Sequence, residues 1–220
     1  DVTSHWETGL GEMTSNVIAV EDDVYVGTED GRVHAVSMDT GEPEVHFRAG
    51  QSDAYEEVPP VFSVTADEDR CYVASDGLYA IDLDDGTEEW YVRAAPSEFY
   101  PLVKGCPAVT DDTAFVGGAG LYAINVETGA EQWYFEPDGL TESAVDGVPT
   151  GVVVTTPAVT DETVYVITDI GALYAVAART GEKVWNVRPD SPEDRLRGSP
   201  VVANGMVYAL GSEYVYAFDT

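Results

Sequence analysis

A unit of 43–50 residues that recurs along the chain constrains its fold more than any other feature. Each copy pairs a Val-Tyr-Val segment with a Tyr-Ala-Ile segment, and a Thr-Gly or Asp-Gly pair follows in the first four copies. One aromatic residue marks each of the five copies: Tyr25, Tyr72, Phe115, Tyr165 and Tyr208. A period of this length, rich in β-branched and aromatic residues, is typical of a propeller blade and not of a helical solenoid.

Each copy divides into four short segments with alternating apolar residues, which predicts four antiparallel strands. Glycine-containing turns separate them, and Thr-Gly or Asp-Gly between the third and fourth segments predicts a hairpin. The fourth segment carries Trp90, Trp133 or Trp185, whereas the first copy has Val45 there. We therefore predict an all-β fold, a β-propeller of four-stranded antiparallel blades. Residues 1–220 form one domain, with blades at about 10–47, 58–92, 105–135, 155–187 and 198–220.

The two ends of the sequence complement each other. The fifth copy lacks a fourth segment, and Trp6 lies near the start with no strands before it. We expect residues 1–8 to supply the outer strand of the fifth blade and to close the ring, which removes two exposed sheet edges. The alternative is that the chain is part of a larger propeller.

The chain carries 41 Asp and Glu residues against 10 Lys and Arg residues, a net charge of −31. These carboxylates are spread through the turns, which favours a surface adapted to high salt, where self-repulsion is screened. We expect a haloarchaeal type of protein. Nucleic acid is an unsuitable partner because phosphate binding needs clustered Lys and Arg. The apolar runs are too short for direct membrane insertion.

The pattern Leu-Tyr-Ala-Ile-x-x-x-Thr-Gly-x-x-x-Trp resembles the pyrroloquinoline quinone (PQQ)-like propeller repeat of quinoprotein dehydrogenases and of the assembly lipoprotein BamB. The resemblance covers nearly all of the chain. It implies that tryptophans dock between neighbouring blades, here Trp6, Trp90, Trp133 and Trp185, and that the joint at Val45 is weaker. Five blades are fewer than the family's usual seven or eight. It also implies an extracytoplasmic or cell-surface location. Because the sequence begins at Asp1, an export signal is expected to lie outside it.

The connections between blades share one face with the hairpins between second and third strands, because strand directions alternate. Arg48, Arg93 and Arg188 occupy one equivalent position there. The candidate binding residues are Arg48, Arg93, Arg188, Arg195, Arg197, Tyr55, Phe99 and Tyr100. Guanidinium groups and aromatic rings together suit a protein partner or a small acidic or sugar-like ligand. The alternative is that these arginines pair with local carboxylates and anchor loops. The sequence does not set the oligomeric state.

No catalytic residue, metal site or cofactor is predicted. Quinoprotein dehydrogenases of the family typically have adjacent cysteines beneath the quinone, a carboxylate–Asn calcium site and an Asp base. Here Cys71 and Cys106 are far apart in sequence, and whether they pair stays open. Residues 82–86 resemble a calcium loop but align with a hairpin turn. We predict a non-catalytic interaction scaffold or ligand-binding module. The alternative is a PQQ-dependent or cryptic oxidoreductase, which would need PQQ with calcium.

Overall fold

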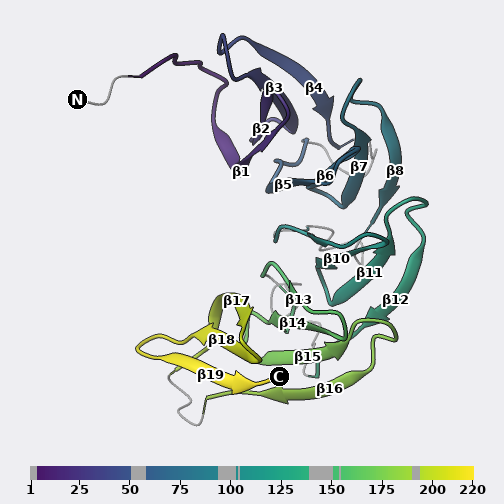
Figure 1. The fold of residues 1–220 in the computed structure, drawn as a ribbon, viewed down its shortest axis with the longest axis vertical. Coiled ribbons are helices and arrows are strands. Elements are labelled where there is room, and N and C mark those ends of the chain that lie inside the picture. The colour runs from purple at the N-terminus through teal and green to yellow at the C-terminus, as the bar shows by residue number, and fades with distance from the viewer. Residues whose placement is uncertain are drawn as a thin grey trace. The chain divides into compact units, whose positions relative to one another are not determined.

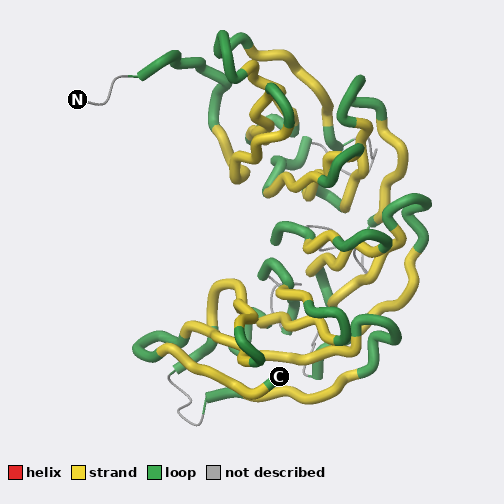
Figure 2. The backbone as a smooth tube through the Cα atoms, in the orientation of Figure 1, coloured by secondary structure: helices red, strands yellow, loops and turns green. Residues whose placement is uncertain are grey.

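Strands and turns make up the described part of the chain in this computed structural model, as Figure 2 shows. The structure describes residues 4–50, 58–93, 103, 105–138, 151–153, 155–189 and 194–220. No helix occurs among these residues, so none of them contributes a helix long and apolar enough to span a bilayer. The predicted all-β fold, with four-stranded antiparallel sheets as blades, is confirmed.

The chain forms two compact units, Asp1–Tyr91 and Val92–Thr220. The first unit contains two sheets in which sequential strands pair antiparallel (Figure 1). The strands of the first sheet are β1 (Met13–Val20), β2 (Asp23–Thr28), β3 (Arg32–Ser37) and β4 (Pro43–Arg48). Those of the second are β5 (Ser63–Ala66), β6 (Arg70–Ala74), β7 (Leu78–Asp82) and β8 (Glu88–Val92).

The second unit contains three sheets of the same up-and-down topology. The third sheet consists of β9 (Ala108–Val109), β10 (Thr113–Gly117), β11 (Leu121–Asn125) and β12 (Glu131–Phe135). The fourth consists of β13 (Ala158–Val159), β14 (Thr163–Ile167), β15 (Leu173–Ala177) and β16 (Lys183–Val187). The fifth has three strands among the described residues, β17 (Arg197–Ala203), β18 (Met206–Leu210) and β19 (Val215–Asp219).

Local chemistry accounts for the hairpins between third and fourth strands. In the third sheet, Asn125 Oδ1 accepts hydrogen bonds from the Thr128 N–H (2.9 Å) and hydroxyl (2.8 Å). Gly129 then adopts a φ of 67°, which a residue with a Cβ reaches only with strain. In the second sheet Asp82 and Gly86 play the same parts. A polar residue and a glycine four positions apart therefore reverse the chain in both sheets.

The second sheet departs from the expected strand bounds. Its first strand begins at Ser63, whereas the predicted blade begins at about residue 58. Proline has no N–H to donate, and the Val61 N–H bonds to the Thr28 carbonyl oxygen at the end of β2 (3.2 Å). Val61 therefore joins the first sheet to the second, and the Phe62 N–H already bonds to the Ala74 carbonyl oxygen of β6 (2.9 Å).

The core of each unit lies between the faces of neighbouring sheets. In the first unit, buried side chains of sheets one and two include Tyr25, Val33, Phe47, Val64 and Ile81. In the second, one cluster joins sheets three and four and another joins sheets four and five. The fourth sheet is therefore covered on both faces, which explains why its two inner strands are apolar at nearly every position.

The N-terminal segment forms no strand between residues 4 and 12. The fifth sheet correspondingly lacks a fourth strand within the described part of the chain. Closure of a five-bladed ring by residues 1–8 therefore stays a prediction.

Candidate functional site

The fourth strand of the third sheet carries a tryptophan that contacts the next blade. Trp133 donates its indole N–H to the Ala178 carbonyl oxygen (2.9 Å), and its ring lies 5.8 Å from Phe115 within its own sheet. The ring also covers Gly181, where an added Cβ would lie 2.7 Å from it. Glycine is needed at this position both for its φ of 72° and for the close approach of the indole.

The other tryptophans occupy comparable places. Trp6 donates to the Met38 carbonyl oxygen (2.8 Å) and covers Gly41, as Trp133 covers Gly181. Trp185 lies 5.8 Å from Tyr165 in its own sheet and 6.4 Å from Phe218 in the fifth. Trp90 lies 5.9 Å from Tyr72 within the second sheet.

In the first blade, His46 takes the place that the sequence pattern assigns to Val45. Its ring makes an edge contact with Tyr25 at 5.2 Å, and Nε2 lies 3.3 Å from the Asp82 carbonyl oxygen of the second blade. Val45 is 43% exposed. The bulge between β3 and β4 falls two residues earlier in the third strand than the equivalent bulge between β11 and β12. It therefore directs His46, and not Val45, towards the second blade. An aromatic residue directly after Val45 was the sequence signal for this contact.

Tyrosines of the third strands hold the connections between blades. Tyr79 donates to Asp76 Oδ1 (2.6 Å) and accepts a hydrogen bond from the Gly50 N–H (3.0 Å). Burial, and then the hydrogen bond to Asp76, raise the pKa of Tyr79, so its hydroxyl stays protonated. Tyr174 donates to the Asp138 carbonyl oxygen (3.0 Å), and Asp138 occupies the position of Gly50 in the repeat.

The fifth blade uses a variant of this arrangement. Tyr216 donates to Asp194 Oδ2, and the Ser212 N–H donates to Asp194 Oδ1. The first of these hydrogen bonds is the main cause of a lowered Asp194 pKa. The repeated tyrosine of the third strands therefore holds a residue of the preceding connection in the second, fourth and fifth blades, a role that sequence reasoning missed. Its signal was a tyrosine, and not phenylalanine, in four of the five copies.

The predicted binding residues divide into three groups. Arg48 ends β4, while Arg93 and Arg188 directly follow β8 and β16, and all three are exposed. Arg195 and Arg197 are also exposed and lie at the entry to the fifth blade. Three further candidates lie outside the described residues: Tyr55, Phe99 and Tyr100.

Among the described residues, none of these five arginines forms an ion pair with a carboxylate. Arg197 instead donates to the carbonyl oxygens of Gly211 (3.2 Å) and Ser212 (3.1 Å), so it anchors the hairpin between β18 and β19. Arg188 hydrogen-bonds the Tyr174 hydroxyl and opposes the rise in the pKa of that tyrosine, which burial causes. Arg197 therefore anchors a loop, as the alternative interpretation expects, but through backbone carbonyl oxygens and not through carboxylates.

Two hollows lie on the side of the turns between third and fourth strands. One of about 840 Å³ lies between sheets three and four, and its lining includes Phe115, Gln132 and Arg179. The other, of about 550 Å³, lies between sheets one and two and is strongly acidic. Its carboxylates are Glu21, Asp23, Glu68, Asp69, Asp82, Asp84 and Glu89. Within the described ranges, no group of three or more His, Cys, Asp or Glu residues is arranged to hold a metal ion.

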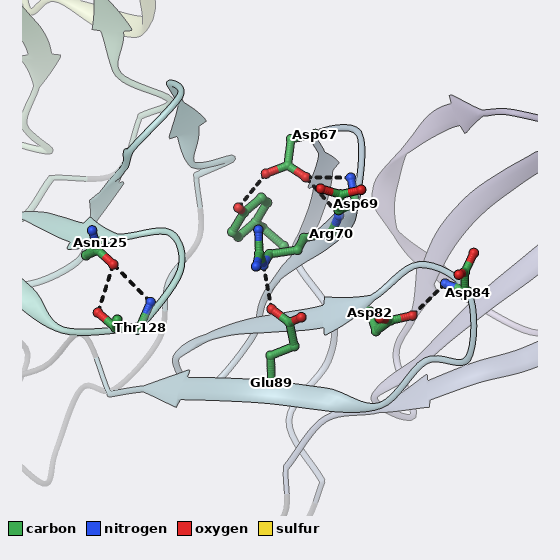
Figure 3. A network of polar contacts seen from close by, with 9 residues as sticks. Asp67, Asp69, Arg70, Asp82, Asp84, Glu89, Asn125 and Thr128 are labelled. Carbon is green, nitrogen blue, oxygen red and sulfur yellow. Dashed lines mark hydrogen bonds and ion pairs between the residues drawn. The ribbon is translucent and has the colours of Figure 1, made fainter.

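Carboxylates in this hollow and beside it serve the turns, as Figure 3 shows. Asp67 Oδ1 accepts from the N–H groups of Asp69 (3.0 Å) and Arg70 (2.8 Å), and Arg70 pairs with Glu89. Asp82 Oδ1 accepts from the Asp84 N–H at 2.8 Å. The stretch 82–86 that resembles a calcium loop is thus a hairpin turn whose first carboxylate is bonded to its own backbone.

The described residues do not fit a quinone with calcium. Within the described part of the chain, Cys71 and Cys106 are not joined by a disulfide bond. Cys71 is fully buried in the core of the first unit, and burial raises the pKa of its thiol to about 12. No carboxylate cluster of the described chain replaces the calcium site. We therefore derive no chemical step through a quinone.

Three solved structures illustrate what this fold resembles. BamB from Moraxella catarrhalis is 17% identical over 94% of this chain and 71% of its own, with a TM-score of 0.52. The quinohemoprotein alcohol dehydrogenase ADHIIG from Pseudomonas putida HK5 is 19% identical over 93% of this chain, with a TM-score of 0.68. A europium-containing methanol dehydrogenase is 15% identical over 98% of it, with a TM-score of 0.72. This chain spans 40% and 51% of the two dehydrogenases.

At these identities the likeness shows the fold alone. No curated protein matches the sequence. A family model does match, over residues 3–136 and 121–220, and its description is outer membrane protein assembly factor BamB. These matches include all five copies of the repeat and Trp6, Trp90, Trp133 and Trp185. The chain therefore belongs to the BamB family of PQQ-like repeat propellers.

Proposed function

We propose that this protein is a non-catalytic interaction module that works outside the cytoplasm of a high-salt organism. Membership of the BamB family supports both the role and the location, because the description of that family is outer membrane protein assembly factor. The composition supports the environment, since a net charge of −31 is tolerated best where salt screens it. The partner is a protein, or a small acidic or sugar-like ligand, that contacts the interblade connections.

The observation that carries this proposal is the repeated arginine after the fourth strand. Arg48, Arg93 and Arg188 stand exposed at equivalent positions, in a chain with only ten basic residues. None has a carboxylate partner among the described residues, although acidic side chains outnumber basic ones fourfold. A guanidinium without a local carboxylate partner is available to a partner's carboxylate or carbonyl groups. A tyrosine hydroxyl fixes the backbone beside one of these positions, at Gly50, two residues after Arg48.

Crosslinking in cells tests the proposal. The wild-type protein and the Arg93→Ala/Arg188→Ala variant are expressed in a halophilic host, and crosslinked partners are compared in the extracytoplasmic fraction. Arg179→Ala is the matched control, because Arg179 is exposed but lies on the turns at the other end of the sheet. We expect one partner with wild type and with Arg179→Ala, and loss of that partner with the double variant.

Equal recovery by all three proteins would contradict the role of these arginines, and so would a failure to recover any partner. Unfolding in molar salt separates a lost contact from a lost fold, since the double variant must keep the wild-type midpoint. For the oxidoreductase alternative, PQQ and calcium are added in molar salt. A red-shifted chromophore or a thermal shift would show that the protein is not simply a scaffold.

A further inference from the structure

The hollow between sheets three and four, here called the larger hollow, occupies the same place in the repeat as the acidic hollow between sheets one and two. Each lies within one of the two compact units, beside the turns that join first to second strands. Carboxylates line equivalent positions of both, Asp111 and Asp161 in the larger hollow and Glu21 and Glu68 in the acidic one. The acidic hollow therefore serves as an internal reference for the larger one.

Arg179 gives the larger hollow a charge that the acidic hollow lacks. It lies in the turn between β15 and β16, at a position where the first three blades carry acidic residues, Asp39, Asp84 and Glu127. It is exposed and forms no ion pair with any described residue, although Asp111 and Asp161 line the same hollow. A guanidinium and carboxylates thus border one space without pairing with each other.

In the acidic hollow the lining cation is already paired. Arg70 forms an ion pair with Glu89, as Figure 3 shows. Asp84 stands at the place of Arg179 and adds a further negative charge. The acidic hollow therefore offers unpaired carboxylates only, whereas the larger hollow offers groups of both signs.

The larger hollow also has more room, with a volume of about 840 Å³ against about 550 Å³. Ala178 lines it where Leu83 lines the acidic hollow, and Thr163 is the equivalent of Arg70. The smaller side chains at these two positions leave the space open. Pockets that hold small molecules typically measure about 300–1,000 Å³, so the larger hollow has a suitable size.

The remaining lining combines apolar contact with one further donor. Val109, Val159 and Ala178 are half-buried and provide apolar surface. The buried Thr113 hydroxyl lies within hydrogen-bond distance of Asp112 Oδ1 (3.0 Å) and of Gln132 Oε1 (3.3 Å). Because Gln132 uses its oxygen in this contact, its amide nitrogen is left as a donor towards the hollow.

We propose that the larger hollow binds a small zwitterion, a free amino acid or a short peptide. The ligand carboxylate contacts Arg179, which can donate two parallel hydrogen bonds, and the ligand ammonium group contacts Asp111 and Asp161. A purely anionic ligand is repelled by these carboxylates, and a purely cationic one by the guanidinium. An apolar ligand side chain covers Val109 and Val159. The hollow lies away from the arginines of the connections, so this inference goes beyond the proposed function and can fail without it.

The probes are glycyl-leucine and free leucine, titrated into the whole chain in molar salt by isothermal titration calorimetry. Two blocked dipeptides test each charge separately: N-acetylglycyl-leucine has no ammonium group, and glycyl-leucinamide has no carboxylate. We expect saturable binding of the zwitterions at one site. Each blocked dipeptide should bind about tenfold or more weakly than glycyl-leucine, because it loses one charge-assisted contact.

Variants of the protein assign each charge to its partner. Arg179→Gln should weaken glycyl-leucine binding about tenfold or more but leave glycyl-leucinamide binding unchanged, since variant and ligand remove the same contact. Asp111→Asn with Asp161→Asn should weaken glycyl-leucine in the same way and leave N-acetylglycyl-leucine unchanged. Asp84→Asn in the acidic hollow is the matched control and should bind glycyl-leucine as wild type does. These side chains are exposed, and circular dichroism checks that each variant keeps the wild-type fold.

Four results would overturn the proposal. The wild-type chain could bind neither zwitterion, or Arg179→Gln could weaken glycyl-leucine and glycyl-leucinamide equally. Tighter binding of N-acetylglycyl-leucine than of glycyl-leucine would indicate a simple anion site. Maltose tests a neutral, hydroxyl-rich ligand, and maltose binding that competes with glycyl-leucine and exceeds it in affinity would assign the larger hollow to that class instead.

Discussion

The joint between the first and second blades and the joint between the third and fourth blades perform the same task with different residues. At the second of these, Trp133 donates to the Ala178 carbonyl oxygen, lies on Gly181 and packs against Phe115. At the first, His46 approaches the Asp82 carbonyl oxygen and packs against Tyr25, while its own backbone oxygen faces Gly86. Both joints keep a ring, a carbonyl partner and a glycine.

The two joints differ in the group that lies against the glycine. At Gly181 it is the face of an indole ring, whereas at Gly86 it is a backbone carbonyl group. An imidazole also buries less apolar surface than an indole, so the first joint gains less from burial. The repeat therefore preserves the contact between blades and not the residue that makes it.

Removing the indole of the third blade should have the largest effect. Trp133→Ala is expected to lower the free energy of unfolding by about 3–5 kcal/mol, because the ring is buried between two blades. Urea unfolding in molar salt, followed by far-UV circular dichroism, measures it. Trp133→Phe keeps part of the buried area and should lose less. A loss below about 1 kcal/mol for the alanine variant would contradict the docking role.

Replacing Gly86 and Gly181 by alanine should lower the free energy of unfolding by different amounts. Gly86 and Gly181 have φ values of 69° and 72°, so both replacements carry about 1 kcal/mol of backbone strain. Overpacking adds about 1–3 kcal/mol, more at Gly86, because its Cβ would lie 2.0 Å from the His46 carbonyl oxygen.

Gly205→Ala is the control that measures the cost of backbone strain without overpacking. Gly205 has a φ of 73°, but the nearest atom to its added Cβ is 4.0 Å away. The free energy of unfolding of the Gly205→Ala variant should be lower than that of wild type by about 1 kcal/mol. Equal losses for all three alanine variants would show that the joints tolerate the added methyl group.

The histidine joint should be weaker than the tryptophan joint. His46→Ala is expected to cost about 1–2 kcal/mol, from one ring contact and one hydrogen bond. Val45→Ala should change stability by less than about 0.5 kcal/mol, because Val45 is largely exposed. Both are measured by urea unfolding. If Val45→Ala costs more than His46→Ala, the assignment of the joint to His46 is wrong.

The smallest effect should be a pH dependence confined to the first blade. His34 is buried, and its pKa is lowered from 6.5 by burial first and then by Arg32 and Arg48. The folded state thus binds its proton less readily than the unfolded state. Stability contributed by His34 is complete above pH 6.5 and falls as pH decreases from there towards the lowered pKa.

The matched variant is His34→Tyr, because the other four copies carry tyrosine at this position. The free energy of urea unfolding should depend less on pH in the variant than in wild type between about pH 7.5 and 5.5. The difference across this range should be under about 1 kcal/mol. Identical slopes would mean that another group titrates instead.

The repeat predicted the β-blades and their strand order because both depend on local chemistry. Alternating apolar residues set the strands, and Thr-Gly or Asp-Gly set the hairpins, each within a few residues. The place of β5 was less predictable, since a hydrogen bond from Val61 to Thr28 of another sheet determines where its pairing begins. Arg48, Arg93 and Arg188 could be identified as exposed from their position, but no local rule shows which of them are paired.

The repeating unit follows from the sequence alone, because alternation fixes which faces are apolar and turn residues fix where the chain reverses. Only the packed sheets show that His46 and not Val45 reaches the second blade, because a bulge two residues earlier changes which side chain points there. They also show that the hydroxyls of Tyr79 and Tyr174 hold the connections at Gly50 and Asp138. Each of these depends on atoms that approach only when two sheets pack together, and no period in a sequence records that approach.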